Sequence, residues 1–229
     1  MDIPSSHVFE SLRDKGVTEL HHANSVVTAC QFLRSKALLS RGTIERIGIT
    51  QTPQESDKID QSHSIWFDVF LDSVDIHNRA HRANVYGPVL FVFDLKVIDR
   101  NGTGRLWLTK LNPTKWAGKA QNERWFQNKA DLDNNFVLGQ FDQMLVARHC
   151  GGELPFGRHL KNIILDNPKL TTDKDVDIFS MAVGALRLAM DDGDIDIPIE
   201  QRTCGNDCAC IDYWAEDDER LFQMFDPKI

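Results

Sequence analysis

The sequence predicts a mixed α+β domain, and three observations support this class. Runs of β-branched and aromatic residues are interspersed with segments whose apolar residues recur at helical spacing. The 229 residues, 41% hydrophobic and 26% charged, are sufficient to bury a sizeable core. The strand-like runs differ in length and do not follow the strand–helix alternation of a doubly wound sheet, which favours α+β.

The first predicted elements are a strand and a helix. Residues 18–23 form a short strand-like run that ends at His21 and His22. Asn24 and Ser25 follow, and residues of these types commonly cap the start of a helix. The helix itself is predicted by apolar residues at helical spacing, namely Val26, Ala29, Cys30, Leu33 and Ala37.

Two longer strands are predicted in the middle of the chain. Gly42 follows the first helix and is expected to end it, because glycine adopts the left-handed conformation that stops helices. The polar residues 50–62 predict a loop. Residues 64–71 and 89–98 are rich in Ile, Val, Phe and Trp, which indicates strands.

Three further strands complete the predicted set. Residues 105–109 follow the turn-forming pair Asn101-Gly102, so we expect them to form a hairpin with the strand at 89–98. Residues 144–148 and 162–165 are shorter apolar runs that also predict strands.

The last 64 residues differ from the rest in charge and in predicted structure. Residues 1–165 hold 20 Lys and Arg against 18 Asp and Glu, whereas residues 166–229 hold 6 against 16, a net charge of −10. Helical spacing predicts one helix at 175–190 and another at 213–225. We therefore expect a main domain at 1–165 and an acidic, mainly helical appendage at 166–229.

Composition excludes several classes of protein. A formal net charge of −8 disfavours a protein that holds nucleic acid by bulk attraction alone. Five cysteines are an odd number, which disfavours a secreted disulfide framework. The first residues lack a basic region followed by an apolar one, and no apolar stretch is long enough to cross a bilayer. We therefore expect a cytoplasmic protein without a membrane partner.

A cysteine cluster offers candidate metal ligands. Cys204-x3-Cys208-x-Cys210 places three soft ligands within seven residues, but a structural zinc ion normally takes four protein ligands. Cys150 or His149 could complete the set from elsewhere in the chain. Because a second Cys-x-x-Cys pair is absent from the sequence, we expect reduced thiols here and do not expect zinc.

A second constellation suggests a competing function, metal-dependent hydrolysis. Asp75, His77 and His81 could share a metal ion if this stretch were helical, since residues four apart lie on one face. The stretch lacks the general-base Glu of metalloprotease helices, so a surface role is favoured. The sequence also contains no P-loop, no dinucleotide-binding glycine motif and no Gly-x-Ser-x-Gly.

Five sequence blocks follow one another in a recognisable order. They are Glu19–Asn24 with Lys36–Gly42, Ser64–Phe70, Tyr86–Phe91, Leu108–Pro113 with Trp125–Phe126, and Phe141–Val146. In this order they resemble blocks of the ADP-ribosyltransferases, in particular the nucleic-acid-modifying toxins of the DarT type. The family's blocks are a histidine-bearing strand with a following Leu-Leu-Ser-Arg segment, an aromatic strand, a Ser-Pro-Met-Leu-Tyr-like strand, a Thr-x-x-Asn segment with trailing aromatics, and a Glu just before a strand.

The resemblance implies a fold, a substrate and an activity. The implied fold is a split β-sandwich that grips NAD, with an added helical region at the C-terminus. The implied reaction breaks the nicotinamide–ribose bond through an oxocarbenium-like state and transfers ADP-ribose to a macromolecule, with nucleic acid expected. The protein would then be a toxin or defence effector whose partners include DNA or RNA and a neutralising antitoxin.

The resemblance also implies which residues contact NAD. Because neighbouring side chains of a strand face opposite sides, only one of His21 and His22 can face the cofactor, and we favour His22. The implied NAD-contacting positions are His21 or His22, Asn24, Tyr86, Thr109 and Asn112.

Two positions depart from the family's pattern. Gln143 stands where the family has its catalytic Glu, and glutamine has no basic form that could take a proton. Asp142 or Glu153 could serve instead, or Gln143 could have been introduced by design. Lys58 is the basic residue in the loop where the family usually has Arg, and it cannot reproduce a bidentate clamp. The competing interpretation is therefore an inactive relative that binds NAD or a partner.

Overall fold

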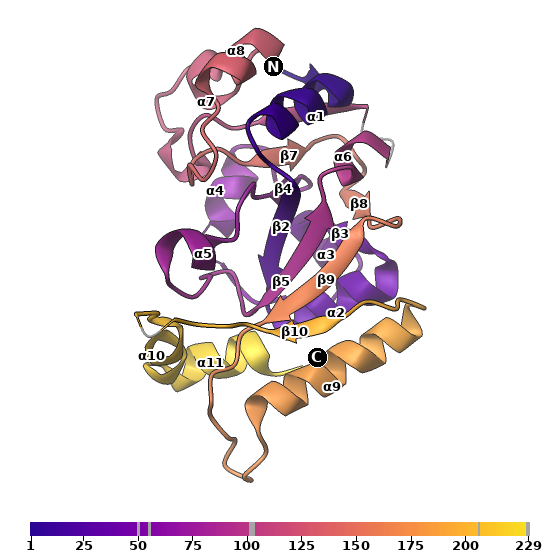
Figure 1. Cartoon of the computed structure of the whole chain (residues 1–229), viewed down its shortest axis with the longest axis vertical. Coiled ribbons are helices and arrows are strands. Elements are labelled where there is room, and N and C mark those ends of the chain that lie inside the picture. The colour runs from indigo at the N-terminus through magenta and orange to yellow at the C-terminus, as the bar shows by residue number, and fades with distance from the viewer. Residues whose placement is uncertain (50, 55, 101–103, 206, 228–229) are drawn as a thin grey trace.

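The computed structural model describes residues 1–49, 51–54, 56–100, 104–205 and 207–227. Within these ranges the chain is a mixture of helices and several sheets, which confirms the mixed class expected from the sequence (Figure 1). In the same ranges, no helix is both long enough and apolar enough to cross a bilayer.

The first sheet has four antiparallel strands from distant parts of the chain. Its strand order is β1 (Ile3–Pro4), β6 (Arg105–Leu108), β7 (Leu145–Ala147) and β4 (Val69–Leu71). The predicted hairpin is wrong, because β6 pairs with β1 and β7 and not with the preceding strand. The Asn101-Gly102 turn that suggested the hairpin lies outside the described residues.

The second sheet also has four strands and extends into the C-terminal region. Its order is β10 (Ile199–Gln201), β9 (Leu160–Leu165), β5 (Val89–Asp94) and β2 (Glu19–Asn24). The β2–β5 and β5–β9 pairs are antiparallel, whereas β10 runs parallel to β9. A separate two-stranded sheet pairs β3 (Ala37–Leu39) with β8 (Glu153–Pro155).

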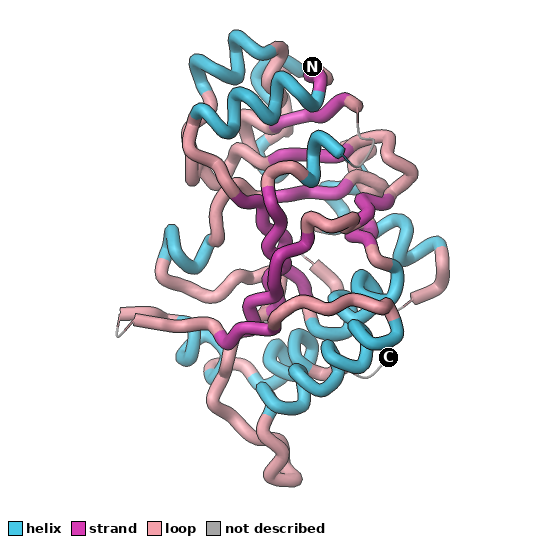
Figure 2. The backbone as a smooth tube through the Cα atoms, turned by 45° about the vertical axis from the view of Figure 1, so that its right-hand side comes forward, coloured by secondary structure: helices cyan, strands magenta, loops and turns pink. Residues whose placement is uncertain are grey.

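A short main-chain contact joins the two four-stranded sheets. His21 in β2 and Asp72, just after β4, form an antiparallel bridge. Each residue's N–H donates to the other's carbonyl oxygen at 2.9 Å. Figure 2 shows the strands of the two sheets crossing near the centre of the molecule.

The helices surround these sheets and vary greatly in length. Their bounds are α1 Ser5–Asp14, α2 Val26–Ser35, α3 Arg41–Arg46, α4 Asp57–Ser62, α5 Ile76–Ala80, α6 Val97–Arg100, η1 Pro113–Lys115, α7 Gln121–Arg124, α8 Lys129–Asn135, α9 Ile178–Asp192, α10 Cys210–Ala215 and α11 Asp218–Phe225.

Helix α2 lies in the core between the second sheet and α9. All its residues from Val26 to Leu33 are buried, because the sheet covers one face and α9 packs on another. Phe32 contacts Phe91 of β5, with ring centroids 5.8 Å apart. The same apolar cluster includes Leu186 of α9 and Trp214 of α10. Residues 166–229 thus share one core with residues 1–165.

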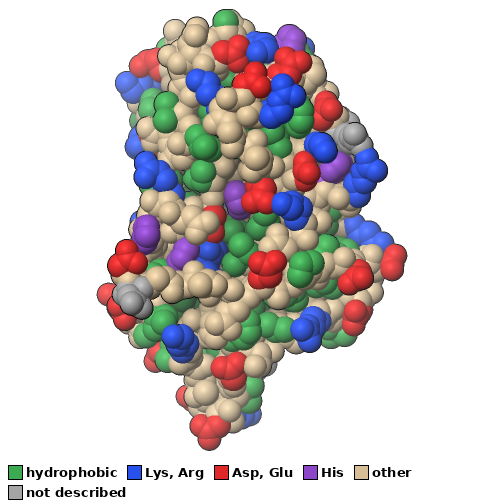
Figure 3. All heavy atoms as spheres, in the orientation of Figure 1, with side chains coloured by type: hydrophobic (Ala, Val, Ile, Leu, Met, Phe, Trp, Pro, Cys, Tyr) green, Lys and Arg blue, Asp and Glu red, His purple; other side chains and the backbone are tan. Residues whose placement is uncertain are grey.

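The charge asymmetry of the sequence is visible on the surface. In Figure 3, acidic side chains outnumber basic ones over the lower part of the molecule, where the C-terminal elements lie. The buried face of α9 is apolar, since Ile178, Ala182 and Leu186 of this helix lie in the core. Among the acids of this region, Asp166 is the exception that the figure cannot show, because it is buried.

Two predicted strands are shorter than expected because side chains and turns end them. Of residues 64–71, only the last three form β4, since the Asp68 N–H donates to the Ile65 carbonyl oxygen and closes a turn. Of residues 89–98, the strand ends at Asp94, whose carboxylate accepts the Lys96 N–H at 2.8 Å. The chain then enters α6.

The helix boundaries also differ from those predicted. Lys36, with φ of 54°, ends α2, and Ala37 belongs to β3. Gly42 lies inside α3, where a Cβ atom would approach Trp66 Cδ1 to 2.7 Å. The predicted loop at 50–62 contains α4, and the predicted helix at 213–225 is divided into α10 and α11 by the cap at Asp217.

A side chain at Gly87 would collide with the main chain of a neighbouring segment. It has φ of 145°, and a Cβ atom would lie 2.2 Å from the Asn24 carbonyl carbon at the junction of β2 and α2. We expect Gly87→Ala to lower the free energy of unfolding by more than about 1 kcal/mol, measured by urea denaturation. The matched control is Gly184→Ala on the exposed surface of α9, where a Cβ atom meets nothing within 4 Å. That change should raise stability by roughly 0.5–1 kcal/mol, and equal effects of the two substitutions would contradict the packing described here.

Candidate functional site

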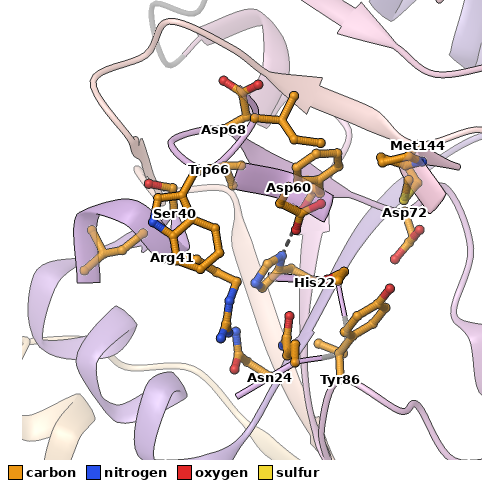
Figure 4. A pocket seen from close by; sticks show the side chains of 18 of the residues that line it. His22, Asn24, Ser40, Arg41, Asp60, Trp66, Asp68, Asp72, Tyr86 and Met144 are labelled. Carbon is orange, nitrogen blue, oxygen red and sulfur yellow. Dashed lines mark hydrogen bonds between the residues drawn. The ribbon is translucent and has the colours of Figure 1, made fainter. Parts of the chain in front are cut away.

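The main pocket lies where β2, β4 and the segment after β3 meet, next to the contact between the two sheets. The space between its lining residues is about 880 Å³, counting the open solvent at its mouth. In Figure 4, His22 lies between Arg41 on one side and Asp72 and Tyr86 on the other. The polar and aromatic side chains that line the pocket are His22, Asn24, Ser40, Arg41, Gln54, Ser56, Asp60, Trp66, Asp68, Phe70, Asp72, Tyr86, Asn112 and Thr114.

His22 lines this pocket and carries a ring nitrogen without a hydrogen-bond partner among the described residues. Burial lowers the pKa of its imidazole, so the ring is neutral at pH 7. Its Nδ1 lies 2.8 Å from the carbonyl oxygen of Phe70 and must donate, because a carbonyl oxygen only accepts. The proton of the neutral ring is therefore on Nδ1, and Nε2 carries a lone pair. Nε2 is buried and has no hydrogen-bond partner among the described residues.

Arg41 supplies the cation of the pocket. Its guanidinium donates to the Asp57 carboxylate at 2.8 Å and to the Thr52 carbonyl oxygen at 2.9 Å. It also lies over the Trp66 ring, 5.6 Å from the ring centroid. These contacts fix the orientation of the guanidinium, so a bound anion would meet a preorganised charge.

Three carboxylic acids of the pocket have raised pKa values. Burial, followed by the nearby Asp75 carboxylate, raises the pKa of Asp72 to about 7. Burial also raises the pKa of Asp60 and of Asp68 to about 6. Asp68 is paired with Arg148 at 2.7 Å, whereas no ion pair or hydrogen bond holds the Asp72 carboxylate within the described part of the chain. Asp72 is thus poised to gain or lose a proton near neutral pH.

Three other predicted cofactor contacts line the pocket. Asn24 is fixed at the β2–α2 junction, where its Oδ1 accepts the Ser25 N–H at 2.9 Å. Asn112 caps η1, with its Oδ1 accepting the Thr114 N–H at 3.0 Å. Tyr86 follows α5, and Figure 4 shows its hydroxyl end and the Asp72 carboxyl group pointing toward one another.

His21 and Thr109 lie outside the lining of the main pocket. His21 faces a second hollow beside Glu19 and Asp75, consistent with the alternation of side chains along β2. Thr109 is fully buried, and its hydroxyl donates to the Asp142 carbonyl oxygen at 2.6 Å and accepts the Met144 N–H at 2.8 Å. Its role is therefore to hold Met144 at the pocket wall.

The two predicted catalytic residues also lie elsewhere. Gln143 Oε1 accepts the Val137 N–H at 2.8 Å, and its Nε2 donates to the Asn135 carbonyl oxygen at 3.2 Å. These bonds direct the amide to the loop after α8 and away from the lining of the pocket. Lys58 is exposed on α4, and Arg41 supplies the pocket's cation in its place. The proposed substitutes Asp142 and Glu153 do not line the pocket either.

Sequence reasoning missed the acidic side chains of this pocket. Asp68 lies within the apolar run at residues 64–71, and Asp72 follows it directly. Asp60 lies in a segment that was expected to be a loop. A charged residue that interrupts an apolar run is a usable signal, because burial of an unpaired carboxylate is costly and is usually retained for a purpose.

The candidate metal ligands are grouped in the structure in another way than the sequence suggested. His77 lies with Cys204, Cys208 and Cys210, whereas the suggested partners His149 and Cys150 are not part of that group. Asp75 caps α5 by accepting the His77 N–H, and His81 ends the helix in a left-handed conformation. Since α5 stops at Ala80, His77 and His81 do not share a helical face, and the alternative Asp75–His77–His81 metal site is not formed. The surface role that the sequence favoured for this stretch does not hold for His77, which is buried.

Comparison with known proteins assigns neither a family nor a function to this chain. Neither the models of known protein families nor the curated proteins include a match to this chain.

The raised pKa of Asp72 predicts a measurable effect on stability. A folded-state pKa near 7, against an ordinary 3.8, means that the folded protein binds this proton more tightly than the unfolded chain does. The contribution of the Asp72 proton to the free energy of unfolding is fully present below about pH 4 and is lost as pH rises through about 7. We expect Asp72→Asn to raise the melting temperature above that of the wild type at pH 8 and to change it less at pH 5. The control is Asp196→Asn, an exposed site, and a shift of equal size at both pH values for Asp72→Asn would contradict the assignment.

Proposed function

We propose that this protein binds NAD in the pocket around His22 and transfers ADP-ribose to a macromolecule, with nucleic acid as the expected acceptor. The observation that carries the proposal is the unpartnered Nε2 lone pair of His22, in a pocket that also contains Asp72 and Tyr86. Such an acceptor suits a ribose hydroxyl or an amide N–H, and NAD carries both groups.

The pocket contains the groups that cleavage of the nicotinamide–ribose bond requires. A carboxylate beside the ribose would stabilise the positive charge that develops as nicotinamide leaves, and it could activate the incoming nucleophile. We assign this role to Asp72 in place of Gln143. Its pKa of about 7 leaves a large fraction ionised at physiological pH. Arg41 supplies a positive charge for the pyrophosphate, and Trp66 and Tyr86 supply aromatic surface.

The architecture is compatible with the split β-sandwich that this activity implies. Two four-stranded sheets meet at the His21–Asp72 bridge, and the pocket opens beside that contact. The net charge of +2 over residues 1–165 is compatible with a polyanionic acceptor, and the acidic outer face of residues 166–229 would limit non-specific binding. A toxin or defence effector with a neutralising protein partner is the biological role that we propose for such an activity.

Labelled NAD tests the proposal. The full chain is incubated with NAD labelled in the adenylate phosphate, in separate mixtures with DNA, RNA and cell protein. Label incorporated into one of these pools identifies the acceptor, whereas release of nicotinamide without incorporation identifies glycohydrolysis. Saturable binding of NAD without turnover would instead support the inactive, NAD-binding interpretation. Absence of both binding and turnover would contradict the proposal.

Three variants assign the catalytic carboxylate. We expect Asp72→Asn to lower the rate of nicotinamide release by about 100-fold or more, because loss of a positioned acid–base group typically costs that much. His22→Ala should weaken NAD binding. Gln143→Glu is the matched control, since that side chain lies outside the pocket lining and its substitution should leave the rate unchanged. A gain of activity in Gln143→Glu would instead restore the assignment of the catalytic position to residue 143.

The pH profile provides a second check on the same assignment. The rate of NAD consumption by the wild type should rise as pH increases through about 7, because the ionised form of Asp72 is the active one. A rate that falls over this interval would exclude ionised Asp72 as the catalytic group.

A further inference from the structure

A cluster of four potential metal ligands lies away from the pocket, where α5 meets the start of α10. One ligand atom from each of four residues, His77, Cys204, Cys208 and Cys210, falls within a group in which all atoms lie within 4.8 Å of one another. His77 Nδ1 is 3.1 Å from Cys210 Sγ and 3.7 Å from Cys208 Sγ. The sequence separates His77 from the three cysteines by more than 120 residues, so the fold alone brings the set together.

These residues match the ligand set of a structural zinc site. Zinc binds cysteine sulfur at about 2.3 Å and histidine nitrogen at about 2.0–2.1 Å, which puts the ligand atoms of a tetrahedral site roughly 3.5–3.8 Å apart. The distances within the cluster run from 3.1 Å to at most 4.8 Å and bracket this range, so small side-chain rotations would bring the four atoms around one ion. Thiolate and imidazole ligands favour zinc over magnesium or calcium, which prefer oxygen.

We propose that His77, Cys204, Cys208 and Cys210 bind one zinc ion as a closed Cys3His site. Four protein ligands leave no open position for a substrate or a water molecule, so the site is structural and not catalytic. It fastens the segment that follows β10 to α5, and α5 begins four residues after Asp72.

A buried ion network holds the ligand-bearing segments in place. The Asp75 carboxylate accepts the His77 N–H at 3.0 Å and pairs with Arg202 at 2.6 Å. Arg202 also pairs with Asp166, which accepts the Trp214 Nε1–H at 3.1 Å. The side chains of Asp75, Arg202 and Asp166 are at most 5% exposed.

This ion network connects the segments that carry the four ligands, and none of the four ligand side chains takes part in it. Asp75 begins the helix that carries His77, Arg202 lies two residues before Cys204, and Trp214 lies in the helix that begins at Cys210. The separation of the ligand-bearing segments is therefore fixed by contacts that do not need the metal. Preorganisation of this kind favours a metal site, because less conformational freedom is lost on binding.

Metal content is the first test. The full chain is expressed with zinc in the medium, purified without chelators, and analysed by inductively coupled plasma mass spectrometry. We expect one zinc ion per chain. Replacement of zinc by cobalt should give the thiolate-to-cobalt charge-transfer band and the visible bands of a tetrahedral site. Absence of bound metal in protein that also fails to take up zinc or cobalt would overturn the proposal.

Variants show whether these four residues hold the ion. Cys204→Ser and His77→Ala should reduce the bound zinc to background. The matched controls are Cys150→Ser and His81→Ala, which change the same residue types outside the cluster and should retain the metal. Since Cys210 is buried, its substitution could unfold the chain, and the test therefore relies on Cys204, at the outer side of the cluster. Retention of zinc by both Cys204→Ser and His77→Ala would contradict the site.

Two further measurements distinguish a zinc site from other states of the cysteines. Chelation should lower the melting temperature of the wild type and leave that of Cys204→Ser unchanged. Intact-mass analysis of the freshly purified protein under denaturing, non-reducing conditions should show all five cysteines as free thiols once the metal is removed. A disulfide between two of the clustered cysteines would overturn the proposal, because an oxidised pair cannot supply thiolate ligands.

Discussion

The main-chain pairing of His21 with Asp72 is the contact on which the rest of the pocket depends. It is the point where two four-stranded sheets from different parts of the chain are joined. Because the pairing fixes β2 against the end of β4, it also fixes His22 and the Asp72 carboxyl group as walls of one pocket. Any rearrangement of either sheet would change the distance between an acceptor nitrogen and a carboxylic acid.

Acidic residues at two places in the molecule differ in whether a cation is paired with them. Asp75 and Asp166 are paired with Arg202, so their charges are neutralised and they fasten the C-terminal region to α5. Asp72 has no such cation and its pKa is raised by burial. Paired acids of this kind hold a structure together, whereas an acid left without a partner in a pocket reduces stability and is typical of a functional site.

Periodicity predicted the regular elements well and the long-range contacts poorly. The strands predicted at residues 18–23 and 89–98 and the helix predicted at 175–190 correspond to β2, β5 and α9, although β5 ends four residues earlier than expected. The strand expected at 64–71 is mostly a turn, because main-chain hydrogen bonding at Ile65 and Asp68 overrides the intrinsic preference of these residues. The predicted hairpin was wrong because strand pairing depends on tertiary contacts that local sequence does not contain.

The dependence on tertiary contacts also explains why the candidate sites were predicted only in part. His22, Asn24, Tyr86 and Asn112, for which the resemblance implies NAD contacts, line one pocket, whereas the Gln143 amide is hydrogen-bonded to the backbone of another loop. His77 lies next to the three cysteines because α10 packs near α5. The spacing of these residues in the sequence could not predict that contact.

A crystal structure of the Asp72→Asn variant with NAD is the most direct test of the central claim. The account predicts the nicotinamide riboside in the pocket, with a ribose hydroxyl or the carboxamide within hydrogen-bond distance of His22 Nε2. NAD bound elsewhere on the chain, with His22 Nε2 making no contact to it, would contradict the account.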